Sequence, residues 1–382
     1  MASSCHLRRC LGQSVVVGLV LLAFCAGAGL ALTPKEATSR LTSLWAHPKL
    51  SGARVAALVV DCATGETLYQ RGAMESLVPA SNEKLPVTAA ALLLLGPEFR
   101  FRTAAFAGGP INSGGIVEGP LLIHGSGDPT AEMDLFGSLV SELRKRGLSG
   151  CCGLWVSGAL TGCAKDGPEI SRGLLAQALG KAKFSVNQAI GVVPASANTH
   201  LLVEHLSDPL GHIILAINKQ SRNSWCDNLW RSLAWMTVGD TAQMPSFLQR
   251  FWRDRALNMK GVQFADGSGL SRRNRATPAF YVGLLRHMNQ CTIEWPAFVG
   301  SLPIAGRDGT LANRMTKGPA RGRVWAKTGT MHDIATLSGY AETLEGRLLA
   351  FSLMMNNLTC PRESARYLQD AACHIIVQLE DS

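Results

Sequence analysis

The sequence predicts a mixed α/β protein of the α+β type, with a central antiparallel sheet flanked by helices. Apolar, strand-like runs lie near both ends of the chain, at residues 55–69 and 323–355, whereas helical patterns dominate residues 223–287. We expect the strands from the two ends of the chain to pair in one antiparallel sheet that the helices between them cover. With 47% hydrophobic residues in a chain of 382, the protein can bury a sizeable core.

The N-terminus predicts a secretory signal peptide over residues 1–31. Arg8 and Arg9 form its charged region, Val15–Phe24 its apolar region, and small residues suited to cleavage follow. A retained membrane anchor is the alternative, because residues 14–32 are nearly long enough to span a bilayer. We therefore expect a periplasmic or otherwise exported protein.

The first elements after the signal alternate between helix and strand. An amphipathic helix is expected over residues 33–45, followed by a buried strand in the apolar run 55–61. Thr64-Gly65 turns the chain into a second strand through Leu68 and Tyr69.

Turns rich in Gly, Pro, Asn and Ser separate the elements of the middle section. Short strands are expected over residues 100–107 and 114–124, and the run 125–129 should end the second of them. A helix is expected over residues 131–146. The cysteine-containing stretch 147–167 is expected to be irregular.

The remaining elements return to the sheet through a helical region. Short strands are expected at residues 188–193 and 213–217, before the helices of 223–287. Three further strands are expected, the last two joined as a hairpin around Glu345-Gly346, at residues 323–330, 335–341 and 348–355. A helix over residues 361–379 closes the chain.

The stretch Pro79–Lys84 begins a helix that carries the first candidate site residues. Pro79 suits a first helical turn, and the run Ala89–Leu95 has high helix propensity. Residues three apart share a face, so Ser81 and Lys84 should lie side by side near the positive end of the helix dipole. The stretch thus offers a nucleophile and a base, although Ser-x-x-Lys also occurs by chance at helix starts with a solvated lysine.

Two later motifs favour the interpretation of Ser81 and Lys84 as a nucleophile and its base. The first, Ser221-Arg222-Asn223, places a hydroxyl and an amide two residues apart, and the second is Lys327-Thr328-Gly329-Thr330. Ser-x-x-Lys, Ser-x-Asn and Lys-Thr-Gly in this order are the signature of penicillin-binding proteins and serine β-lactamases.

Finer motifs narrow the resemblance. They are Gly96–Phe101 (GPEFRF), Gly125–Thr130 (GSGDPT), Phe184–Asn187 (FSVN), Asn218–Asn223 (NKQSRN) and Asp266–Arg272 (DGSGLSR). With these motifs the chain, from about residue 50 to 375, resembles the D-alanyl-D-alanine carboxypeptidase/endopeptidase family, the low-molecular-mass class C penicillin-binding proteins of the penicillin-binding protein 4 type.

The resemblance implies the penicillin-binding and serine β-lactamase-like transpeptidase fold, with a small inserted subdomain. The expected organisation is a signal peptide at 1–31, the first part of a catalytic domain at 32–105, an inserted subdomain at 106–183 and the second part of the catalytic domain at 184–382. The family implies a longer insertion than lies between Lys84 and Ser221 here, so accessory parts should be trimmed. Cys226 stands where the family has a small residue, a difference of packing.

The expected activity is that of a serine D-Ala-D-Ala carboxypeptidase or endopeptidase on peptidoglycan stem peptides, with β-lactam antibiotics as inhibitors. Ser81 should form the acyl-enzyme, and Lys84 should act as its base if a nearby cation and burial keep it neutral. The other expected roles are proton relay by Ser221, amide binding by Asn223, a grip on the terminal carboxylate by Lys327 and Thr328, and an oxyanion hole from the backbone of Ser81 and Thr330, with Gly329 permitting close approach. The alternatives are a β-lactamase-like hydrolase and a catalytically idle peptidoglycan-binding or scaffolding homologue.

The charge and cysteine content of the chain indicate which classes of partner and which compartment to expect. The net charge of +9 comes without any nucleic-acid-binding motif, so anionic wall polymers or peripheral membrane association suit it better than nucleic acid. No cofactor and no zinc-type cysteine spacing is recognisable. The eight cysteines after the signal fit an oxidising compartment. Cys163 could pair with Cys151 or Cys152, whereas Cys360 and Cys373, about 20 Å apart on one helix, could not pair.

Overall fold

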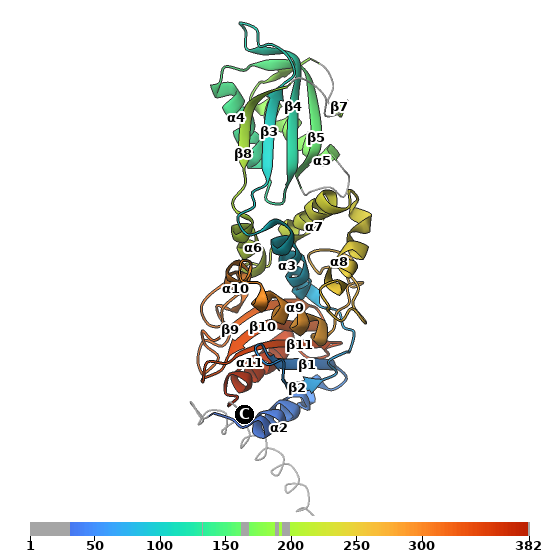
Figure 1. The fold of residues 1–382 in the computed structure, drawn as a ribbon, viewed down its shortest axis with the longest axis vertical. Coiled ribbons are helices and arrows are strands. Elements are labelled where there is room, and N and C mark those ends of the chain that lie inside the picture. Colours follow the sequence, from blue (N-terminus) through green and yellow to red (C-terminus); the bar gives the residue numbers. More distant parts are fainter. Residues whose placement is uncertain (1–30, 132, 162–167, 188–190, 193–198, 381–382) are drawn as a thin grey trace, which may run out of the picture.

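The computed structural model describes residues 31–131, 133–161, 168–187, 191–192 and 199–380. The signal peptide expected at 1–31 lies, except for its last residue, outside this part. Within it, no helix has the length and apolar character needed to cross a membrane. The molecule is elongated, with one sheet at each end of its long axis and a group of helices between them (Figure 1).

The sheet at one end is five-stranded and antiparallel. Its strands, in spatial order, are β2 (Thr67–Arg71), β1 (Arg54–Asp61), β11 (Leu348–Asn356), β10 (Ile334–Glu342) and β9 (Val324–Met331). Strand β1 lies against β11 with Ala57 opposite Leu353, so segments from the two ends of the sequence meet inside the sheet. The prediction of an antiparallel sheet built from distant parts of the chain is confirmed.

Both faces of this sheet are covered, which explains why its strands are apolar without alternation. Helices α2 (Pro34–Trp45) and α11 (Arg362–Val377) pack on one face, and α9 (Pro278–Gln290) packs on the other. Val55, Ala57 and Val59 of β1 belong to the first core, and the residues between them belong to the second. Helix α2 starts where predicted, with a capping box between Thr33 and Glu36.

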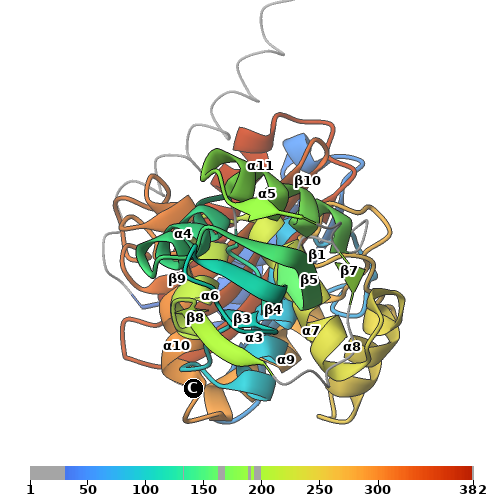
Figure 2. The same ribbon diagram turned by 90° about the horizontal axis from the view of Figure 1, so that it is seen from above.

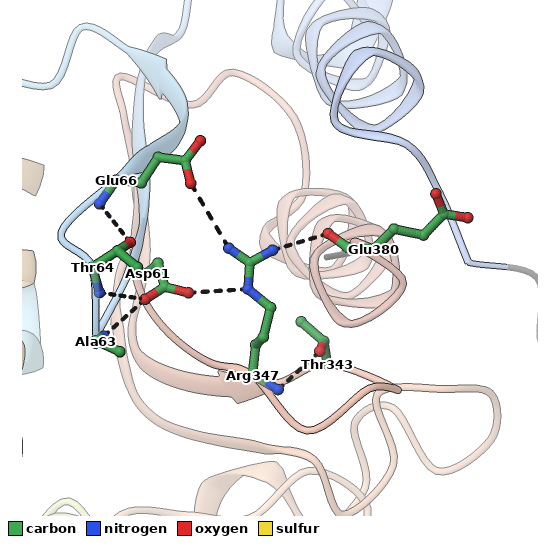
Figure 3. Close-up of polar contacts among 7 residues, drawn as sticks. All are labelled: Asp61, Ala63, Thr64, Glu66, Thr343, Arg347 and Glu380. Carbon is green, nitrogen blue, oxygen red and sulfur yellow. Dashed lines mark hydrogen bonds and ion pairs between the residues drawn. The ribbon is translucent and has the colours of Figure 1, made fainter. Parts of the chain in front are cut away.

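A network of ion pairs and hydrogen bonds connects the β1–β2 and β10–β11 turns with Glu380, near the C-terminus (Figure 3). Arg347, after the β10–β11 turn, contacts Asp61 Oδ2 at 3.0 Å and the carbonyl of Glu380 at 2.9 Å. Asp61 Oδ1 accepts from the backbone N–H groups of Ala63 and Thr64. Burial raises the pKa of the Asp61 carboxyl, but these N–H donors and Arg347 together outweigh it, so the pKa lies below its usual value.

Replacing Arg347 by methionine should lower the free energy of unfolding by about 3 kcal/mol, because it leaves the buried Asp61 carboxylate without its cation. Since the pKa of Asp61 is lowered in the folded state, the contribution is full above its unfolded value near ~4 and disappears as pH falls through the folded value. Urea unfolding at neutral and acidic pH measures this difference. The matched control is Arg323→Met, which breaks the more exposed pair with Glu342 and should cost ~1 kcal/mol or less. Equal losses in the two variants would contradict the assignment.

The second sheet lies at the opposite end of the molecule and is formed by the inserted segment. Its spatial order is β6 (Ser185–Val186), β5 (Gly150–Thr161), β4 (Ile116–Asp128), β3 (Arg102–Ala107) and β8 (His200–Leu206), with β7 (Gly191–Val192) beside β5. Helices α4 (Met133–Lys145) and α5 (Pro168–Lys181) pack on one face of it (Figure 2). Arg102 pairs with Leu206, so the segment leaves and rejoins the rest of the chain at adjacent points.

This sheet spans residues 102–206, wider than the 106–183 expected for the insertion. We propose the wider limits for the subdomain. The GSGDPT motif joins it to α7 (Asn223–Thr237), where Asn228 Nδ2 donates to the Pro129 carbonyl at 3.0 Å and Ser232 Oγ donates to the Gly127 carbonyl. Asp128 is a turn acceptor, bonded to the N–H and hydroxyl of Thr130.

Three sequence-based assignments are wrong. Residues 125–128 do not end the strand, because β4 continues to Asp128 and stays paired with β5, with Gly125 opposite Gly158 and Asp128 opposite Thr161. Residues 147–167 are not wholly irregular, since β5 fills 150–161. Residues 213–217 are not a strand but part of α6 (Leu210–Lys219), whose isoleucines are buried at helical spacing, so core packing overrides their strand propensity.

The remaining elements lie around these two sheets. They are η1 (Pro48–Leu50), η2 (Ala80–Glu83), α3 (Lys84–Leu95), η3 (Thr241–Gln243), α8 (Met244–Arg253), α10 (Trp295–Ser301) and η4 (Gly309–Leu311). The helices predicted within 223–287 are therefore confirmed as α7, α8 and α9. Residues 188–190 and 193 of the strand expected at 188–193 lie outside the described part. So does Cys163, whose pairing stays a prediction. Cys360 and Cys373 were expected on one helix, but α11 begins at Arg362, so that Cys360 lies before it; both cysteines are free.

Candidate active site

Ser81 lies in the 3₁₀ turn η2, immediately before α3. The sequence placed it inside an α-helix beginning at Pro79, but the α-helix begins only at Lys84, and Pro79 caps the turn instead. Ala80 has a positive φ of 49°, which bends the chain just before the serine. Even so, the predicted neighbours meet, since Lys84 Nζ lies 3.1 Å from Ser81 Oγ.

Side chains of β10 fix the turn that carries Ser81. Thr336 Oγ1 donates to the Pro79 carbonyl at 2.7 Å, and Asn82 Nδ2 donates to Ser338 Oγ at 2.7 Å. Ser338 Oγ is in turn bonded to Ser352 Oγ of β11 at 2.8 Å. All these side chains are buried, where hydrogen bonds are stronger than in water, so the position of Ser81 is fixed by the sheet.

Lys84 is fully buried and its amino group meets three oxygen atoms. Besides Ser81 Oγ, these are Asn223 Oδ1 at 2.8 Å and the Ser268 carbonyl at 2.5 Å. Burial lowers the pKa of the Lys84 ammonium, against an opposing effect of nearby acidic groups such as Asp227. A neutral amine has two hydrogens, one for each carbonyl-type oxygen, and keeps its lone pair for the Ser81 hydroxyl.

The DGSGLSR loop presents the Ser268 carbonyl to Lys84. Asp227 of α7 accepts from Ser268 N at 2.8 Å and from Gly267 N at 3.1 Å. Asp266 accepts from Gly269 N at 2.7 Å and holds the other side of the loop. The sequence marked this loop as one of the family motifs, but it gave no sign of Asp227 or of a backbone carbonyl as a partner of Lys84.

Gly269 allows this loop to contact η2, the turn that carries Ser81. It has φ +82°, and a Cβ there would lie 1.9 Å from the Ala80 carbonyl oxygen. Gly269→Ala should therefore displace Ala80 and Ser81 and lower covalent labelling by penicillin at least ~10-fold. Gly52→Ala is the matched control, because Gly52 has φ +79° but open space around it, and it should cost only ~1 kcal/mol of stability. Labelling at the wild-type rate by both variants would contradict this role.

Ser221 and Lys327 form the second side of the site. Lys327 Nζ donates to Ser221 Oγ at 3.0 Å and to the Thr328 carbonyl at 2.9 Å. Ser221 has a positive φ of 56° at the end of α6, just before Asn223 begins α7. Lys327 is fully buried, and burial followed by the charge of Lys84 holds the pKa of its ammonium well below the usual value.

Strand β9 passes close to the turn that carries Ser81 because Gly329 has no side chain. A Cβ at Gly329 would lie 2.1 Å from Thr336 Oγ1 and 2.7 Å from the Pro79 carbonyl oxygen. Strand β9 is also an edge strand of its sheet, so some of its backbone N–H and C=O groups are not used by a neighbouring strand. The structure thus agrees with the close approach expected at Gly329.

A pocket of about 520 Å³ opens beside these groups. Four of the residues named from the sequence line it, Ser81, Ser221, Thr328 and Thr330. Asn223 is exposed and reaches the site through Lys84, while Lys327 is enclosed beneath it.

Sequence reasoning missed the other residues that line this pocket. They are Thr310 and Asn313 near η4, Arg314, and Arg366 of α11. Thr328 Oγ1 donates to Thr310 Oγ1 at 2.8 Å. No motif marks these residues, since they come from a loop and from a helix whose pattern indicates only packing.

Arg272, Cys226 and the possibility of a bound metal ion were also considered from the sequence. Arg272, the last residue of the DGSGLSR motif, is in an ion pair with Asp333. Among the described residues no group of His, Cys, Asp or Glu is arranged to hold a metal ion. Cys226 is buried and bonded to the Gly267 carbonyl, a packing role as expected.

A serine bonded to a buried lysine, between a Ser-x-Asn helix start and a Lys-Thr-Gly edge strand, defines the class of penicillin-binding proteins and serine β-lactamases. Within it, the chain belongs to the D-Ala-D-Ala carboxypeptidase 3 (S13) family, whose sequence profile matches residues 37–156 and 159–377. The protein is accordingly a hydrolase.

Individual relatives agree with the family. The chain is 28% identical to a D-alanyl-D-alanine carboxypeptidase of Actinomadura sp. (strain R39), over 88% of this chain and 83% of that protein. It is also 28% identical to a carboxypeptidase of Mycobacterium tuberculosis, over 86% and 82%. Among solved structures, penicillin binding protein 4 from Haemophilus influenzae superposes with a TM-score of 0.77 at 18% identity, over 88% of this chain and 99% of that one, which shows a shared fold.

Proposed function

We propose that the protein is a serine D-Ala-D-Ala carboxypeptidase that acts on peptidoglycan stem peptides through an acyl-enzyme on Ser81. The observation that carries this is the environment of Lys84, a buried amine whose two carbonyl-type partners leave its third position facing Ser81 Oγ. An idle binding protein has no need for a buried lysine in this arrangement, because burial of a cation is costly.

In the first half of the reaction, Ser81 passes its proton to Lys84 Nζ while its oxygen attacks the carbonyl between the two D-alanines. The resulting oxyanion would accept hydrogen bonds from the backbone N–H groups of Ser81 and Thr330, each contributing roughly 3–4 kcal/mol. The C–N bond then breaks and the released D-alanine amine takes a proton from Ser221, while the ammonium of Lys84 returns a proton to Ser221, so that both groups regain their starting forms. Ser221 accepts a hydrogen bond from Lys327, so its own hydrogen is free to be donated.

In the second half, water attacks the acyl-enzyme with Lys84 again as the base, and Ser81 is regenerated. Asn223 Oδ1 accepts a hydrogen bond from Lys84 Nζ. The side-chain NH₂ group of Asn223 is then left to donate to a carbonyl of the substrate. Thr328, Gly329 and Thr330 lie on an edge strand, which can pair with an extended peptide. The proposal also includes export of the chain, directed by its N-terminal segment. The positively charged chain would then associate with anionic wall polymers or with a membrane surface.

The test uses the purified wild-type chain with a stem pentapeptide ending in D-Ala-D-Ala and with a fluorescent penicillin. Release of free D-alanine and a covalent penicillin adduct are expected together. Absence of both would refute the proposal. Rapid turnover of penicillin without a lasting adduct, and without D-alanine release, would identify the β-lactamase-like hydrolase instead.

A further inference from the structure

The reaction proposed above needs a cation that faces the substrate. A peptide ending in D-alanine carries a carboxylate one carbon away from the nitrogen that leaves, and bound carboxylates are best held by charged donors. Lys327, expected from the sequence to grip this carboxylate together with Thr328, is fully buried. Its amino group already serves Ser221 Oγ and the Thr328 carbonyl.

Two guanidinium groups do line the pocket, those of Arg314 and Arg366. Arg314 is already neutralised, because its Nη2 and Nε contact Asp370 Oδ1 at 2.6 and 2.9 Å. Its Nη2 also contacts Gln369 Oε1 at 3.2 Å. Arg314 is therefore committed to α11 and has little capacity left for a ligand.

Arg366 is in the opposite situation. None of the ion pairs between described residues includes it. The hydrogen bond of its side chain is to Thr330 Oγ1, at 3.3 Å from Nη2. A guanidinium carries five N–H donors in a planar fork that fits a carboxylate with two parallel bonds. Arg366 thus brings an uncommitted, half-buried cation to β9, the strand that contains the Lys-Thr-Gly motif and Thr330.

We propose that Arg366 binds the α-carboxylate of the leaving amino acid and so selects substrates whose leaving group is a free-carboxylate D-amino acid. This assignment rests on the proposed function and adds a specificity residue to it. It also gives the wall of the pocket formed by α11 a purpose, since Arg366 and Thr330 can hold the carboxylate from two sides. A leaving group with a neutral amide in place of the carboxylate would lose the ionic contact and should bind less well.

The test compares a stem pentapeptide ending in D-Ala-D-Ala with the same peptide carrying a C-terminal amide. Affinities are measured by calorimetry in a Ser81→Ala background, where turnover cannot interfere, and kcat/KM is measured in the otherwise wild-type chain. Without the Arg366 change, the acid should bind better than the amide by about 10- to 100-fold, the range of a charged hydrogen-bonded contact. Arg366→Gln should remove most of that preference by weakening binding of the acid, with little change for the amide. Arg366→Lys should restore part of it.

The matched control is Arg362→Gln, an exposed arginine one turn earlier on the same helix, which should leave the preference unchanged. Equal losses for acid and amide in Arg366→Gln, or an unchanged preference, would overturn the assignment. This outcome is separable from failure of the proposed function. In the first case the wild type still releases D-alanine; in the second it neither releases D-alanine nor forms a penicillin adduct, while the calorimetric comparison still reports on Arg366.

Discussion

Replacing Ser81 by alanine should abolish covalent labelling by penicillin and lower D-alanine release at least ~10,000-fold. The hydroxyl of Ser81 is the nucleophile in the proposed reaction, and without it no acyl-enzyme can form. Intact-mass spectrometry after incubation with penicillin measures the adduct directly, and peptide mapping of the wild-type adduct should place it on Ser81.

The matched control is Ser224→Ala. Ser224 is an exposed hydroxyl on the first turn of α7, next to Asn223 but with no contact to Lys84 among the described interactions. This variant should label at the wild-type rate. An adduct that persists in Ser81→Ala, or one that disappears in Ser224→Ala, would assign the nucleophile elsewhere.

Replacing Lys84 by methionine should lower the rate of acylation by roughly 1,000-fold, the usual contribution of a general base. Methionine keeps most of the buried volume but removes the amine between Ser81, Asn223 and the Ser268 carbonyl. The second-order rate constant of acylation, followed across pH, is the measurement. The matched control is Lys49→Met, at an exposed lysine far from the motif residues in the sequence.

The pH dependence adds a second readout for Lys84. Lys84 accepts a proton only when it is neutral, and burial lowers the pKa of its ammonium. Acylation in the wild type should therefore rise as pH increases through that lowered value, and it should fall when acid protonates the amine. In Lys84→Met this limb should disappear and leave a slow, flatter profile. The same limb in both proteins would mean that another group controls it.

Much of the fold could be predicted from the sequence, because the main sheet consists of local patterns. The apolar runs that form β1, β9, β10 and β11, and the capped amphipathic helix α2, have periods and boundaries that short stretches encode. The errors fell where local pattern and tertiary context disagree. The isoleucines of α6 favour a strand in isolation, and the glycines at the end of β4 suggest a turn until β5 is beside them.

The candidate site divides in the same way. Its motif residues could be named because the spacing Ser-x-x-Lys, Ser-x-Asn and Lys-Thr-Gly is itself a chemical requirement. From the sequence alone, Ser81 and Lys84 could be predicted as the nucleophile and its base, and the class of the protein could be predicted as well. It also indicated the Gly329 approach, since only a residue without a side chain permits it.

Only the tertiary structure decided which charged side chains are buried and which line the pocket. Both lysines of the motifs are fully buried, Lys84 against the Ser268 carbonyl and Lys327 against Ser221. Arg366, a half-buried cation that lines the pocket, comes from the last helix and matches no motif. The reason is physical. Burial, pKa and ion pairing depend on which distant segments meet, and α11 reaches the pocket only because the ends of the chain fold together over the same sheet.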